Sequence, residues 1–78
     1  MSVLKGIEIL NKKDHRVVLL LPDQKHTYWD VWSRNTKNNE QTVYYQMRLT
    51  TVLDMIYRAG CQGHEVKLKY EGGDNVEL

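Results

Sequence analysis

The 78-residue sequence lacks the features that staple very small proteins or anchor proteins in membranes. It contains one cysteine, Cys61, so no intramolecular disulfide can form. Its longest uninterrupted apolar run covers only residues 17–21, whereas a membrane-spanning helix needs roughly 20 apolar residues. The first residues alternate apolar side chains with Lys5 and Glu8 instead of building the apolar stretch of an export signal. We therefore expect a cytoplasmic protein that does not contact a membrane.

Neither sign of charge dominates the chain. Lys and Arg number 11 and Asp and Glu number 10, so the formal net charge of +1 neither requires a polyanionic partner nor excludes one. Three of the acids, Glu71, Asp74 and Glu77, lie within residues 70–78, where no base occurs. We expect one small domain over residues 1–71, followed by an acidic, flexible tail over residues 72–78. The core of this domain should be marginal, because so short a chain buries only about 60% of its unfolded surface.

Turn-forming residues divide the first half of the chain into strands. Asn, Asp and Pro cluster at residues 11–14, 21–24 and 35–39, where they favour reversals of chain direction. The segments between these turns are rich in Val, Leu, Ile, Tyr and Trp, which favour strands. The predicted strands are residues 3–10, 15–21, 26–34 and 41–48, and we expect the apolar second strand to be central in the sheet.

Residues 41–59 allow two interpretations: a strand followed by a helix, or one long helix that ends at Gly60. We favour a strand over 41–48, because the adjacent Tyr44 and Tyr45 lose rotamer freedom in a helix and Thr50 offers a separate N-cap. Residues 51–59 then form the helix, and Gly60 ends it.

The helix is expected to bury an apolar stripe formed by Val52, Leu53, Ile56 and Tyr57. Residues 64–70 alternate apolar and charged side chains, as a half-buried strand does. The predicted fold class is therefore α+β: a mostly antiparallel sheet of about five strands, in the order β-β-β-β-α-β, with one helix packed on one face.

Few residues could carry catalytic or metal chemistry. Cys61 and His64 have the spacing of a thiol–imidazole pair or of half a zinc site. No neighbouring acid could orient such a pair, and no second pair of ligands completes a zinc site. We expect Cys61 to be a buried structural thiol, and we expect no catalytic residue, no metal and no cofactor. The chain is interpreted as a non-enzymatic protein.

Strand parity identifies one unusual surface. In the third predicted strand, Trp29 and Val31 should face the core, which leaves the even-numbered residues toward solvent. A register that pairs Trp32 with Tyr44 and Tyr28 with Arg48 extends this outer face onto the fourth strand, because cross-strand partners share a face. The candidate binding residues are Tyr28, Trp32, Arg34, Tyr44, Arg48 and His26.

The second predicted strand enlarges this surface. Both of its faces are apolar, with Val17, Leu19 and Leu21 on one side and Val18 and Leu20 on the other. A single helix covers only one face of a sheet, so the second apolar face should join the aromatic residues in a patch typical of interfaces. Alternatively, the aromatic residues serve only as cross-strand pairs that stabilise the sheet.

Four antiparallel strands followed by a helix, with Tyr28, Trp32, Arg34 and Arg48 on the sheet, resemble the single-strand-DNA-binding transcriptional coactivator family. That resemblance implies dimerisation and a basic, aromatic sheet face that binds nucleic acid. The strand at 64–70 and the near-neutral charge depart from the family. In size and composition the chain also resembles small accessory proteins of phages and mobile elements, many of which inhibit or redirect a host protein.

Together these observations lead us to expect a small accessory or inhibitory module that binds another protein and forms a homodimer. The alternative is a single-stranded nucleic-acid-binding protein that uses the outer sheet face. The two functions differ in salt dependence, because binding to phosphates weakens steeply as salt rises.

Overall fold

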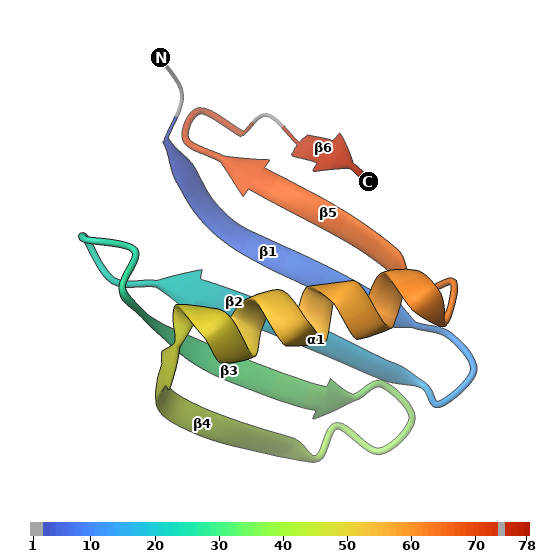
Figure 1. Ribbon diagram of the computed structural model, residues 1–78. Helices are drawn as coiled ribbons and strands as arrows, with labels where there is room; N and C mark the ends of the chain where they lie inside the picture. The colour runs from blue at the N-terminus through green and yellow to red at the C-terminus, as the bar shows by residue number, and fades with distance from the viewer. Residues whose placement is uncertain (1–2, 74) are drawn as a thin grey trace.

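Within residues 3–73 and 75–78, which the computed structural model describes, six antiparallel strands form one sheet and one helix crosses a single face of it (Figure 1). The strand order across the sheet is β4-β3-β2-β1-β5-β6. The predicted α+β class and the β-β-β-β-α-β order are confirmed. The elements are β1 (Leu4–Asn11), β2 (Arg16–Pro22), β3 (Tyr28–Asn35), β4 (Gln41–Arg48), α1 (Leu49–Cys61), β5 (Glu65–Tyr70) and β6 (Asn75–Glu77).

The first four strands form a meander because short polar loops close each hairpin. In the β2–β3 loop the Asp23 carboxylate accepts the backbone N–H of Thr27 at 3.0 Å. In the β3–β4 loop the Asn35 side-chain oxygen accepts the N–H of Lys37 at 2.8 Å. These side chains supply hydrogen bonds to a loop backbone that has no ladder partner. As predicted, β2 lies inside the sheet, and residues 41–48 form a strand.

The hydrophobic core lies between α1 and the face of the sheet that it covers. From the helix, Val52 and Ala59 are buried and Met55 and Ile56 pack against them, at the i, i+3, i+4, i+7 spacing of one helical face. The stripe expected from the sequence was wrong in two members, Leu53 and Tyr57, which are 56% and 71% exposed. The buried residues of the core are Ile7, Ile9, Leu20, Trp29, Val31, Val52, Ala59 and Val66.

Both ends of α1 differ from the sequence prediction. The helix begins at Leu49, so Thr50 lies within it and is not the N-cap, and the Arg48 side chain makes no capping bond. At the other end the helix runs through Gly60, which the prediction took as its end. Gly63 adopts φ +76°, its N–H donates to the Gly60 carbonyl at 3.1 Å, and the N–H of His64 donates to the Ala59 carbonyl at 2.9 Å. These two bonds form a Schellman motif with Gly63 at its left-handed position, and the helix ends at Cys61.

Residues 75–77 of the expected acidic tail form β6, which extends the sheet beyond β5. Gly72 and Gly73 both adopt positive φ, at 87° and 88°, and so allow the tight reversal that returns the chain to β5. Asp74, the remaining acid of that tail, lies outside the described residues. The described part of the chain contains no helix long and apolar enough to cross a lipid bilayer.

Candidate functional site

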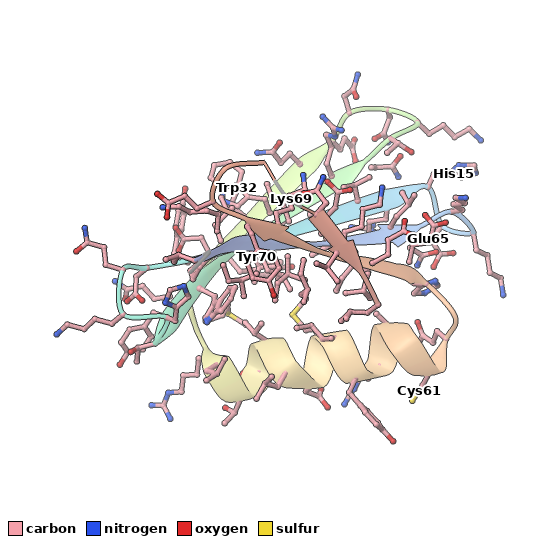
Figure 2. The ribbon with its side chains drawn as sticks, turned by 90° about the horizontal axis from the view of Figure 1, so that it is seen from above. His15, Trp32, Cys61, Glu65, Lys69 and Tyr70 are labelled. Carbon is pink, nitrogen blue, oxygen red and sulfur yellow. The ribbon has the colours of Figure 1, made fainter. Side chains whose placement is uncertain are left out.

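The face of the sheet opposite α1, here called the outer face, is covered by none of the described elements. Figure 2 shows the sheet nearly edge-on, with α1 on one side and with Trp32 and Lys69 on the other. Cross-strand pairing gives this face a central row that runs from β4 to β6. The row contains, in order, Val43, Trp32, Leu19, Glu8, Lys67 and Glu77.

The part of the outer face formed by β4, β3, β2 and one end of β1 carries an apolar patch. Trp32 pairs with Val43 on one side and Leu19 on the other, and the next row joins Val17 to Leu10. These five side chains, here called the apolar patch, are all partly exposed. The second apolar face of β2 therefore lies where the sequence analysis expected it, beside Trp32 and opposite the helix.

A pocket of about 200 Å³ opens in this patch. Val17, Leu19 and Trp32 supply its apolar lining, and Glu8, Arg34 and Gln41 supply its polar lining. The indole nitrogen of Trp32 is shielded from solvent, so the ring lies against its neighbours instead of standing free. An apolar recess flanked by one acid and one base can accept an apolar side chain and orient it through polar contacts.

The other part of the outer face, on β1, β5 and β6, is charged but internally paired. Lys69 lies 3.0 Å from the Glu8 carboxylate, and Lys67 lies 3.8 Å from that of Glu77. Within residues 3–73 and 75–78, Arg34 forms no such ion pair. The side chain that carries unbalanced charge next to the pocket is therefore Arg34.

The predicted pairing of Tyr28 with Arg48 is confirmed. Tyr28 is 47% exposed. It lies four residues before Trp32 on β3, so the two positions are roughly 13 Å apart along the strand. Beside Tyr28, the loop residues Asp23, Gln24, Lys25 and Thr27 help to line a broader hollow of about 650 Å³. Tyr28 and Arg48 thus belong to the outer face but lie at its far end.

The predicted pairing of Trp32 with Tyr44 was wrong. Tyr44 pairs with Val31 on the helix side of the sheet, and Val43 takes the place beside Trp32. The cause is a β-bulge in β4 opposite Asp30, where Gln46 adopts φ +55° and donates its N–H to the Asp30 carboxylate at 3.2 Å. One extra residue in a strand reverses the face of every residue beyond it.

His26 was also placed incorrectly. It lies in the loop before β3, at φ +57°, and not in the strand. Its Nε2 is 3.0 Å from the carbonyl oxygen of Leu4, and its ring meets the edge of Trp29 with centroids 6.2 Å apart. The imidazole therefore ties the β2–β3 loop to β1 and belongs to the packing around the core.

The structure also revises the environment of Cys61, which was expected to be buried. Its side chain is exposed and points away from the sheet (Figure 2). The imidazole of His64 hydrogen-bonds the Gln62 side-chain oxygen at 2.9 Å. Among the described residues, no group of three or more His, Cys, Asp or Glu side chains is arranged to hold a metal ion.

Comparisons of the chain with protein-family models, with curated proteins and with solved structures found no match. The arguments about function therefore rest on the surfaces of this molecule. Sequence reasoning found Tyr28, Trp32, Arg34 and Arg48 of the outer face but missed Val43 and Glu8. The signal for Glu8 was the alternation of β1, which places it between the apolar residues Ile7 and Ile9.

Proposed function

We propose that this protein is a non-enzymatic binding module whose apolar patch holds another protein. The observation that supports the proposal is the pocket of about 200 Å³ between Glu8 and Arg34, on a sheet face that the described chain leaves uncovered. Contiguous apolar surface of this kind marks interfaces in soluble proteins. A module of this size acts by occupying a surface of its partner, which suits an accessory or inhibitory role.

Trp32 is the central anchor of the proposed interface. It lies in the middle of the apolar row, between Val43 and Leu19, and large side chains at such positions dominate binding energy. Arg34 beside the pocket would pair with a carboxylate of the partner, and this contact would fix the orientation of the complex. Charged rows on β5 and β6 would form the polar rim.

Protein binding fits the outer face better than nucleic-acid binding does. A surface for single-stranded nucleic acid combines several aromatic platforms with free cations. Here Tyr44 lies on the opposite face, the Trp32 indole is packed against its neighbours, and Lys67 and Lys69 face the carboxylates of Glu77 and Glu8. The features that favoured a nucleic-acid surface are thus dispersed or neutralised, apart from Arg34, which forms no ion pair within residues 3–73 and 75–78.

The test is to capture binding proteins from a lysate of the source organism, purify the main one and measure its affinity for three variants by calorimetry. Trp32→Ala should weaken binding at least thirtyfold, since hot-spot truncations cost about 2 kcal/mol or more. Tyr44→Ala is the matched control, because Tyr44 is an exposed aromatic residue on the other face, and it should bind as the unaltered chain does.

Arg34→Ala separates the two classes of partner. Against nucleic acid, this variant should reduce the steep salt dependence by about one unit of slope. Against a protein bound through the apolar patch, affinity should depend only weakly on salt in both forms. Binding of single-stranded nucleic acid alone, with a steep salt slope, would contradict the proposal. Equal affinities of the Trp32→Ala variant and the unaltered chain would do so as well.

A further inference from the structure

A second apolar surface lies on the helix side of the molecule, apart from the outer face. Leu49, Leu53 and Tyr57 recur at every fourth position of α1, so they share one flank of the helix, and they are 42%, 56% and 71% exposed. On β6, Val76 is 45% exposed and pairs with Leu68, which places it on the same side of the sheet as α1. The three helix residues are exposed because α1 packs on the sheet through Val52, Met55, Ile56 and Ala59 instead. Val76 is exposed because one helix cannot cover six strands.

Between this flank of α1 and the end of the sheet lies a hollow of about 630 Å³. Ile56 and Tyr57 line it from the helix, and Val66 and Leu78 line it from β5 and the residue after β6. Leu78 is held there by its N–H, which donates to the Val66 carbonyl at 2.8 Å. The molecule therefore presents an apolar ridge, formed by Leu49, Leu53 and Tyr57, directly beside an apolar recess.

A ridge beside a recess on one face is what a twofold contact requires. In a twofold interface the same patch serves both subunits, so the ridge of each copy can enter the recess of the other. Residues near the axis also meet their own counterparts, so charge there would repel itself. Among the described residues that line the hollow, none is Lys, Arg, Asp or Glu, and the one histidine, His64, hydrogen-bonds the Gln62 side chain at 2.9 Å. The nearest charges on the helix, Asp54 and Arg58, pair with each other at 2.9 Å.

The exposed area suits a dimer. The ridge together with Val76 and Leu78 exposes on the order of 500 Å² per copy, judged from the size of such side chains. A standard interface buries about 800 Å² per partner, and in homodimers about 65% of it is apolar. The available apolar area is therefore close to what one stable twofold interface needs.

We infer that the helix-side surface binds a second copy of this chain, with the ridge of each copy seated in the recess of the other. The inference does not depend on the outer face, which stays free in such a dimer to bind another protein. It also explains how a domain with a small core can leave so much of its helix apolar, because the dimer contact supplies the burial that one chain cannot.

Sedimentation equilibrium of the full chain, from low to high micromolar concentration, tests this inference. The unaltered chain should sediment as a dimer with a micromolar dissociation constant. Leu53→Glu should raise that constant at least thirtyfold. Each of the two copies would then place one carboxylate in the centre of the apolar contact. Thr51→Glu is the matched control, since Thr51 is exposed on the opposite side of the same helix and the substitution should leave the dimer intact.

Circular dichroism of each variant checks the fold, which Leu53→Glu should preserve because Leu53 is mostly exposed. Isotope-filtered NMR of mixed labelled and unlabelled chains should show contacts from Tyr57 of one copy to Val76 of the other. A strict monomer at high micromolar concentration would overturn the inference. A dimer that survives Leu53→Glu but is lost in Trp32→Ala would also overturn it and move self-association to the outer face.

Discussion

Alanine substitutions at the two glycines near the end of α1, Gly60 and Gly63, should change the stability of the fold in opposite directions. Gly60 lies inside the helix, and a Cβ there would meet no atom within 4 Å. Gly60→Ala should therefore stabilise the fold by about 0.5–1 kcal/mol, the helix preference of alanine over glycine. Gly63 has the same free space but adopts φ +76°. Gly63→Ala should cost about 1–2 kcal/mol, because an L-residue is strained in that region.

Urea denaturation followed by circular dichroism measures both effects, with all variants compared at one protein concentration. Gly63→Asn serves as the control, because asparagine tolerates the left-handed region and should lose less than alanine does. Stabilisation by Gly63→Ala together with destabilisation by Gly60→Ala would refute the Schellman assignment. That result would instead support the sequence prediction that the helix ends at Gly60.

Four substitutions test the sheet. Trp29→Ala should lower the free energy of unfolding by about 3–5 kcal/mol, since Trp29 is 3% exposed. Trp32→Ala should lower it by at most about 2 kcal/mol, because it removes only two cross-strand pairs. Thermal denaturation of the two variants measures both losses. Equal losses would show that the two faces of β3 were assigned incorrectly. Asp30→Ala should cost about 0.5–1.5 kcal/mol by removing the acceptor for the N–H of Gln46, and hydrogen exchange at that amide should accelerate. Gln46→Gly should stabilise the bulge by up to about 1 kcal/mol in urea denaturation, and a clear loss would contradict its positive φ.

The order of elements could be predicted from the sequence because local signals agree there. Turn residues separate the first four strands, and β5 alternates cleanly between apolar and charged side chains. The pairing of Tyr28 with Arg48 was predicted because the alternation along each strand places both residues on the outward face. These features depend on neighbours in the sequence, which a single chain displays directly.

The bulge in β4 could not be predicted, and for this reason Tyr44 was wrongly assigned to the candidate site. Tyr44 and Val43 are both good strand residues, so parity alone decides which of them faces Trp32. Parity is reversed by one extra residue, which is held by a hydrogen bond to Asp30 on the neighbouring strand. That contact depends on tertiary structure and leaves no periodic signal in β4.

The helix ends and β6 were missed for related reasons. Gly60 and Gly63 are equally good stop residues in sequence, and the backbone bonds of the Schellman motif select the second. The strand over residues 75–77 is too short to show alternation, and it forms because Gly72 and Gly73 return the chain to β5. The flank that Leu53 and Tyr57 occupy depends on how α1 is rolled on the sheet, which the pattern of apolar residues alone does not fix.

The central claim is that the outer face binds another protein, and site-specific photo-crosslinking tests it most directly. Benzoylphenylalanine would replace Leu21, which lies on the outer face beside the apolar patch and is 36% exposed, and in a second sample it would replace Tyr44 on the other face. After irradiation in cell lysate, the Leu21 position should give a covalent adduct with one other protein, and Trp32→Ala should abolish that adduct. The Tyr44 position should give none with that protein. Adducts with nucleic acid alone at Leu21, or the same protein adduct at both positions, would contradict the account.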